Sequence, residues 1–251
     1  MAVFDLYINK ISAYVDDLES KGRRVKKIES AFMAGQVKDL MPFLQGTESI
    51  SETILRGDTF LELGNPVTSS CAFVLWTQNS GLIKDGRVTL IGPDIQESAG
   101  QNLPFGQVLM LGGEELDEKE HESLELSSHI GNKIKGYMVR SMRQNLWARV
   151  SNKAAQNGFC FEVLGEALIA IYKSDHPKIK AMEAVFVTSN EADVRLLENI
   201  AAQVEKVNKE INKTNWQIKG YDIECALDCS TCSDKPVCDN IKEVLREKSR
   251  K

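Results

Sequence analysis

The spacing of apolar residues predicts a helical start to the chain. Over residues 3–21, apolar side chains recur every three or four positions, which is the period of one face of an α-helix. Gly22 favours a helix end because glycine readily adopts the left-handed conformation found there. A second helix is predicted over residues 28–44, with an interruption at Pro42.

From residue 57 the pattern changes to short apolar runs between turn-forming residues, which is typical of strands. Strands are predicted at residues 59–64, 72–76, 87–92, 105–111, 146–150 and 183–188. Helices are predicted at residues 115–134, 151–158, 161–173, 190–211 and 240–248. This order predicts an α+β fold with a mixed or antiparallel sheet, packed helices and a C-terminal cysteine-rich metal loop.

The same pattern divides the chain into three expected parts. Residues 1–50 form an N-terminal helical segment, residues 51–215 an α+β domain, and residues 216–251 a cysteine-rich loop with a terminal helix. Apolar residues make up 42% of the chain, which is enough for a sizeable core.

Charge and hydropathy exclude two classes of partner. A net charge of -5 and a pI near 5.4 argue against binding to nucleic-acid phosphates. The longest apolar runs fall well short of the roughly 20 residues that a membrane helix needs. The first residues also lack the basic and apolar regions of a signal peptide, so we expect a cytoplasmic, globular protein.

The strongest chemical signal is a cluster of cysteines near residue 230. Four of the six cysteines fall within fourteen residues with the spacing C-x3-C-x2-C-x5-C, namely Cys225, Cys229, Cys232 and Cys238. Clustered thiols form either disulfides or a metal site. In a reducing compartment a metal site is the better interpretation.

Four thiolates suit either zinc or an iron–sulfur cluster. Structural zinc usually draws its ligands from two separated pairs of residues. Here all four thiols come from one compact loop, as in ferredoxin-type loops, which favours a four-iron four-sulfur cluster over a zinc-binding structural domain.

The other candidate residues have simpler interpretations. Cys71 and Cys160 lie in apolar surroundings and are expected to be buried, inert thiols. The three histidines, His121, His129 and His176, are expected at the surface. No hydrolase motif or phosphate-binding P-loop motif is present in the sequence.

A tryptophan among arginines is a further candidate. Trp147 is flanked by Arg140, Arg143 and Arg149. Arginine binds phosphate with bidentate geometry and indole offers a flat face, so this group could bind an anionic ligand with a flat part. The alternative is ordinary surface charge around a packed tryptophan.

Several ordered stretches together resemble one family, the β subunit of carbon-monoxide dehydrogenase/acetyl-CoA synthase (the CO-methylating acetyl-CoA synthase). The matching stretches are Gly57-Asp58, Glu62-Leu63-Gly64, Asp85-Gly86-Arg87-Val88, Ile91-Gly92-Pro93-Asp94-Ile95, Leu103-Pro104-Phe105-Gly106, Trp147-Ala148-Arg149-Val150-Ser151 and Leu164-Gly165-Glu166. The resemblance covers about residues 55–238, corresponding to the family's middle domain and the start of its metal domain.

The resemblance implies a four-iron four-sulfur cluster that is bridged in the family to a dinickel site. Cys229 and Cys232 match cluster ligands, and Cys238 looks like the third. The family's fourth ligand lies further along and has no counterpart here, so Cys225 is expected to replace it. The family's Cys-Gly-Cys nickel motif is also missing from this sequence. Nickel binding is therefore in doubt, and we do not expect this chain alone to make acetyl-CoA.

The resemblance also implies a ligand and partners. Trp147 matches the family's tryptophan associated with CoA binding, and Arg143 and Arg149 are its expected phosphate partners. The alternative is that Trp147 packs between the sheet and the helix that begins near Ser151. No catalytic residue is assigned.

Two classes of function follow. One is an acetyl-CoA synthase-like iron–sulfur subunit of one-carbon metabolism, acting in acyl or methyl transfer with a corrinoid or redox protein. The other is a non-catalytic electron-transfer or docking module. Metal delivery or sensing is a third and weaker possibility.

Overall fold

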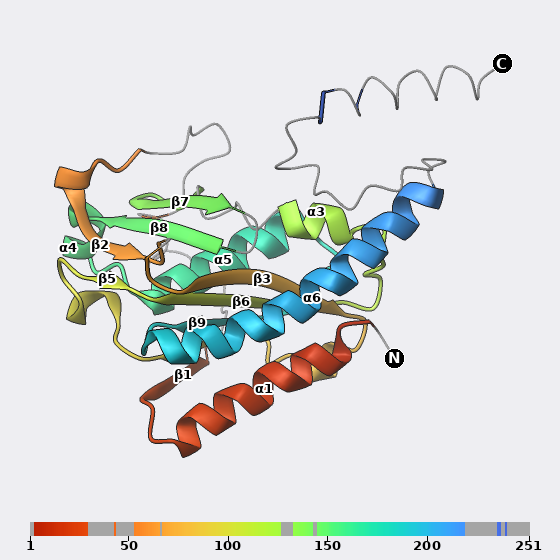
Figure 1. Ribbon diagram of the computed structural model, residues 1–251, viewed down its shortest axis with the longest axis horizontal. Coiled ribbons are helices and arrows are strands. Elements are labelled where there is room, and N and C mark those ends of the chain that lie inside the picture. Colours follow the sequence, from red (N-terminus) through yellow and green to blue (C-terminus); the bar gives the residue numbers. More distant parts are fainter. Residues whose placement is uncertain are drawn as a thin grey trace. The chain divides into compact units, whose positions relative to one another are not determined.

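The computed structural model describes residues 3–29, 43, 53–65, 67–126, 133–142, 145–218, 235–236 and 239 (Figure 1). The chain divides into two compact units, residues 1–207 and residues 208–251. The sheets and most of the helices described below belong to the first unit.

A five-stranded mixed sheet forms the centre of the first unit. Its strands, in spatial order, are β1 (Val25–Glu29), β4 (Arg87–Ile91), β9 (Ala181–Val187), β6 (Phe105–Gly112) and β3 (Ser70–Thr77). β4 pairs with β9 in parallel, and β3 pairs with β6 in parallel. The pairs β1–β4 and β6–β9 are antiparallel. β6 and β9 are buried along their whole length, as expected for central strands covered on both faces.

A second, four-stranded sheet carries the candidate site. Its order is β5 (Asn102–Leu103), β2 (Thr59–Leu63), β8 (Asn145–Ser151) and β7 (Tyr137–Met142). β2 and β5 are parallel, and the other two pairs are antiparallel. β8 contacts β3 and β6 of the larger sheet. The prediction of an α+β fold with a mixed sheet is confirmed, with two sheets in place of one.

Helices cover both faces of the larger sheet. In Figure 1 the first part of α6 (Glu191–Ile218) lies in front of it, α1 (Asp5–Ser20) lies below α6, and α5 (Phe161–Asp175) lies behind the sheet. Phe161 of α5 packs its ring 5.2 Å from Phe186 and 5.8 Å from Phe105. Two shorter helices are α3 (His121–Leu126) and α4 (Asn152–Gln156). Ser151 caps α4 by accepting a hydrogen bond from the Ala154 backbone N–H, as predicted.

The packing requires glycine in α5. A Cβ atom at Gly165 would collide with the side chain of Val88 on β4. A side chain at this position would therefore push the helix away from the sheet. Gly165 lies in one of the stretches that carry the family resemblance, and the fold gives a physical reason for it.

Four segments differ from the prediction. Residues 28 and 29 were predicted to begin a helix, but they end strand β1, because Ile28 and Glu29 pair with Val88 and Arg87 of β4. The rest of that predicted helix lies outside the described residues, apart from position 43. β5 and β7 were not predicted at all. In the described part of the predicted helix at residues 115–134, the α-helix spans only His121–Leu126, after turns at residues 114–115 and 118–120.

His121 is buried, so the prediction of a surface position is wrong for this residue. Its side chain is 1% exposed, and its Nδ1 accepts a hydrogen bond from Trp76 Nε1 at 3.1 Å. The ring of Phe4 stacks on it, with ring centroids 5.7 Å apart. Burial lowers the pKa of His121 to about 4. His176 is half-buried, and His129 lies outside the described residues.

The two solitary cysteines are free thiols. Cys71 is buried as predicted, and burial raises its pKa. Cys160 is half-buried at the N-cap of α5, so the burial predicted for it is only partial. In the part of the chain that the structure describes, no helix combines the length and apolar character needed to cross a membrane.

Candidate functional site on the outer face of the small sheet

A polar row crosses three strands of the four-stranded sheet. The register places Asn102 of β5 opposite Glu62 of β2, and Glu62 opposite Arg149 of β8. On either side of Glu62, Leu61 and Leu63 are buried in the core. Because side chains alternate between the two faces of a strand, the polar row lies on the face turned away from this core.

The side chain of Arg149 is held by several contacts. Its Nε donates to Glu62 Oε1 at 2.7 Å, and its Nη1 donates to the backbone oxygen of Ile54 at 3.1 Å. The guanidinium carbon lies 4.7 Å from the centre of the Trp147 ring, in a cation–π contact. Arg149 and Glu62 are 17% and 22% exposed at their side chains, so the pair is largely shielded from water. These contacts fix the guanidinium before any ligand arrives.

Trp147 lies on the same face of β8 as Arg149, two residues away. Its side chain is half-buried. Its Nε1–H is buried and has no hydrogen-bond partner among the described residues. Buried indole N–H groups normally find an acceptor, so this donor is an unsatisfied polar group in the described part of the chain.

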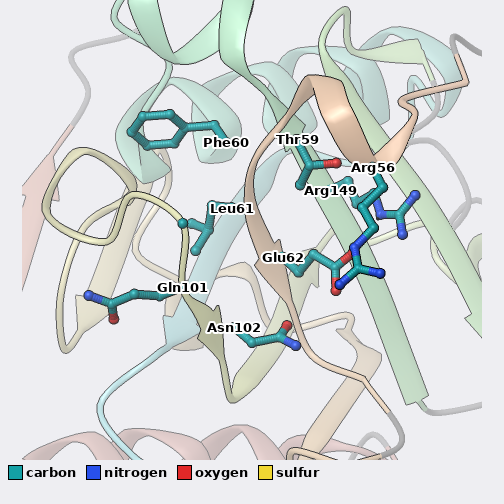
Figure 2. Close-up of a pocket in the computed structure, with 9 residues that line it drawn as sticks. Arg56, Thr59, Phe60, Leu61, Glu62, Gln101, Asn102 and Arg149 are labelled. Atoms are coloured by element: carbon teal, nitrogen blue, oxygen red, sulfur yellow. Dashed lines mark hydrogen bonds and ion pairs between the residues drawn. The ribbon is translucent and has the colours of Figure 1, made fainter.

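A cavity of about 450 Å³ opens beside this row (Figure 2). Its polar lining comprises Arg56, Thr59, Glu62, Gln101, Asn102 and Arg149. Arg56 comes from the 3-10 turn Arg56–Asp58, which leads directly into β2. In Figure 2 its side chain lies on the same side of the cavity as Glu62 and Arg149.

The charge of this lining is positive. Two guanidinium groups and one carboxylate give a net charge of +1, although the whole chain carries -5. The guanidinium of Arg56 makes no hydrogen bond or ion pair with any residue that the structure describes, while that of Arg149 is held by Glu62. A concave site with one free and one engaged guanidinium, and with side-chain amides beside them, can bind an oxyanion.

Comparison with known proteins shows the family to which the chain belongs. The sequence model of the CO dehydrogenase/acetyl-CoA synthase complex beta subunit matches residues 19–194. The chain belongs to this family. The match includes both sheets and the Trp147–Arg149 pair, and it ends before the cysteine cluster.

Individual relatives agree with the family match. The acetyl-CoA decarbonylase/synthase complex subunit beta of Archaeoglobus fulgidus is 30% identical over 169 residues, which are 66% of this chain and 31% of that protein. The subunit of the same name from Methanothermobacter thermautotrophicus is 28% identical over 196 residues, covering 77% of this chain and 40% of the relative. This member of the family therefore matches between about a third and two fifths of the length of these relatives.

The structure brings together two of the residues predicted for the site. Trp147 and Arg149 are in contact. Arg143 and the four clustered cysteines, Cys225, Cys229, Cys232 and Cys238, lie outside the described residues. Within the described ranges, no group of three or more histidine, cysteine, aspartate or glutamate residues is placed to hold a metal ion.

Sequence reasoning missed Arg56, Glu62, Gln101 and Asn102 as site residues. They become neighbours only through strand pairing, since β5 and β2 are separated by about 40 residues in the chain. One signal was available: Glu62 is a charged residue between two leucines in an apolar strand. A charge at such a position needs a partner, and β8 supplies Arg149.

Proposed function

We propose that this chain is a CoA-binding iron–sulfur protein of the acetyl-CoA synthase type, acting in anaerobic one-carbon and acetyl-CoA metabolism. Family membership supports the general class. The observation that carries the CoA part is the contact between Trp147 and Arg149 on the outer face of the small sheet, beside a cavity with a positive lining.

The chemistry of CoA suits this face. Its adenine ring needs a flat apolar partner, and its phosphates need cations with bidentate geometry. Trp147 is half-buried, so part of the indole is open to a ligand. Arg149 lies against the ring and is positioned by Glu62, and Arg143, which follows β7 in the sequence, would add a second cation. Both arginines were predicted from sequence to bind phosphate.

For the metal, the four thiols Cys225, Cys229, Cys232 and Cys238 form a donor set that fits a four-iron four-sulfur cluster. When bound, such a cluster supplies electron transfer or a bridge to a further metal. The cysteines would hold it as thiolates, the soft ligands that iron–sulfur clusters require. The sequence contains no Cys-Gly-Cys, so we propose that this polypeptide does not complete a dinickel site by itself.

The names of the relatives suggest that this chain has protein partners. The relatives carry the name of a complex subunit, acetyl-CoA decarbonylase/synthase complex subunit beta. We infer that this chain also works beside other subunits, with a corrinoid protein or a redox protein as the partner that exchanges a methyl group or electrons with it.

A titration with CoA tests the proposal. Anaerobically purified chain is titrated with CoA while tryptophan fluorescence is followed, and Trp147→Phe separates the signal of Trp147 from those of Trp76 and Trp216. We expect a saturable change that is lost in the Trp147→Phe variant. No saturable change at millimolar CoA would leave Trp147 as a packing residue. It would then favour the second candidate, a non-catalytic electron-transfer or docking module.

A further inference from the structure

The cavity beside the polar row contains residues that the CoA proposal does not use. We propose that it is a binding site for a phosphate-type oxyanion, with Arg56 as the main cation and Glu62 as a resident counterion that weakens the site. The oxyanion could be free inorganic phosphate or a phosphate group of a nucleotide such as CoA. The oxyanion site is inferred from the residues of the cavity and does not depend on the proposed function. Only the idea that the phosphate belongs to CoA rests on the proposed function.

Arg56 is the group best placed to bind an incoming anion. It is exposed at the cavity wall, and its guanidinium makes no hydrogen bond or ion pair within the described part of the chain. The turn that carries it is fixed, because the Asp58 backbone N–H donates to Leu55 oxygen at 3.0 Å and Thr59 Oγ1 donates to the same oxygen at 2.9 Å. A free guanidinium on a fixed turn can form two parallel hydrogen bonds to a phosphate.

Glu62 sets the affinity of the site. Its carboxylate engages Arg149 Nε at 2.7 Å and also lines the cavity. It therefore neutralises one of the two guanidinium groups and repels a second anion close by. The site is thereby limited to a net charge of +1, which suits a weakly held, exchangeable ligand better than a permanently bound one.

One amide supplies a further contact. The side chain of Asn102 is exposed, lies on the same side of the strand as Glu62 and Arg149 in Figure 2, and makes no hydrogen bond to a described residue. Its amide offers donors and an acceptor, so it can contact a phosphate oxygen or a hydroxyl group of an attached sugar. The volume of about 450 Å³ exceeds what one phosphate needs and lies in the range of small-molecule sites.

Charge-changing variants of the full chain test the proposal with effects in opposite directions. Arg56→Gln removes the free guanidinium, and Glu62→Gln removes the resident charge but keeps an oxygen that can accept from Arg149 Nε. Arg195→Gln is the matched control, because it removes one arginine charge at an exposed position that does not line the cavity. Circular dichroism at low temperature verifies that each variant is folded.

The measurement is the melting temperature in sodium phosphate compared with sodium chloride at equal ionic strength, since a ligand that binds the folded state raises it. From the shifts we expect the dissociation constant for phosphate to rise about tenfold or more in Arg56→Gln. In Glu62→Gln it should fall by about threefold to tenfold. It should stay at the wild-type value in Arg195→Gln. Equal stabilisation of all four proteins would mean a general salt effect and would overturn the proposal.

The same variants distinguish this site from the CoA proposal. If CoA binds with a change in Trp147 fluorescence and Arg56→Gln leaves the affinities for both CoA and phosphate unchanged, the oxyanion site is wrong and CoA binding stands. If phosphate binding depends on Arg56 but CoA gives no saturable signal, the oxyanion site stands and the CoA proposal fails. If CoA and phosphate compete and both depend on Arg56, the site takes a phosphate of CoA.

Discussion

At the residue scale, the fold gives a physical role to Arg149, one of the residues that carry the family resemblance. The sequence indicates only that an arginine follows a tryptophan by two positions. The structure shows that this arginine is stacked on the ring and bound to Glu62 and the backbone of Ile54. Such an arginine is pre-organised, so a phosphate that binds it does not have to order the side chain first.

The first prediction concerns Arg149 directly. Arg149→Ala should weaken CoA binding by about 1.5–3 kcal/mol, because a charged hydrogen bond to phosphate is lost. Arg149→Lys keeps the charge but not the planar fork, so it should restore only part of the affinity. The affinity is measured by the fluorescence titration. An unchanged affinity in Arg149→Ala would show that this guanidinium has only a structural role.

A second prediction at this scale concerns His121. Its pKa is lowered from 6.5 to about 4 by burial, despite Glu125 Oε2 lying 3.5 Å from its Nε2. Between these two pH values the unfolded chain binds more protons than the folded chain, so stability is lost as pH falls through this window. We expect the free energy of unfolding to fall by about 3 kcal/mol from pH 7 to pH 4 through this residue alone.

Denaturant unfolding at several pH values measures this effect, with His121→Asn as the comparison. Asparagine keeps an acceptor for Trp76 Nε1 but does not titrate in this range. The variant is expected to be less stable at pH 7 and to lose less stability on acidification. The same slope against pH in both proteins would show that other groups cause the loss.

At the element scale, close packing between α5 and β4 overrides helix propensity. Gly165→Ala would add helix propensity of about 1 kcal/mol at an exposed site. Here the added methyl would collide with Val88, so we expect a net loss of about 1–3 kcal/mol in the free energy of unfolding. Gly57→Ala is the control, because a Cβ there meets no atom within 4 Å. Equal stability of the two variants would contradict the packing account.

The cysteine cluster gives the next prediction at the scale of an element. Cys229→Ala and Cys232→Ala should each abolish the visible absorption of the anaerobically purified chain, because each removes a thiolate ligand. Cys225→Ala should do the same if Cys225 is the fourth ligand. A full and equally stable cluster in Cys225→Ala would reject that assignment and leave the other three standing.

Elements with strong periodicity could be predicted from the sequence, and elements defined by their partners could not. α1, α5, α6 and strands β2 to β4 have the expected positions, since their apolar patterns are set locally. The last two residues of β1, Ile28 and Glu29, were assigned to a helix because this charged segment forms a strand only through pairing with β4. The candidate site divides in the same way: Trp147 and Arg149 are neighbours in sequence, whereas Glu62, Arg56 and Asn102 reach them only through the sheet.

At the scale of the whole molecule, the chain combines a family-type α+β unit with a cysteine cluster that lies beyond the family match. Residues 19–194 match the family, and the four cysteines lie between residues 225 and 238. The function proposed here therefore has two separable parts, CoA binding by the first unit and iron–sulfur binding by the four clustered cysteines, and each can fail without the other.

The expectation that this chain alone does not make acetyl-CoA is also testable at this scale. Supplied with nickel, CO, CoA and a methylated corrinoid, the chain alone should form no acetyl-CoA, because its sequence lacks the Cys-Gly-Cys thiolates that nickel needs in this family. Acetyl-CoA is measured by mass spectrometry against a reaction without protein. Formation of acetyl-CoA above that blank would overturn the expectation.

The most direct test of the central claim is the metal content of the chain purified without oxygen. Iron, acid-labile sulfide, nickel and zinc are measured against protein concentration. We expect about four iron and four sulfide per chain and a brown protein, from the composition of the cluster type. A colourless protein with about one zinc per chain would contradict the claim and identify the four cysteines as a structural zinc site.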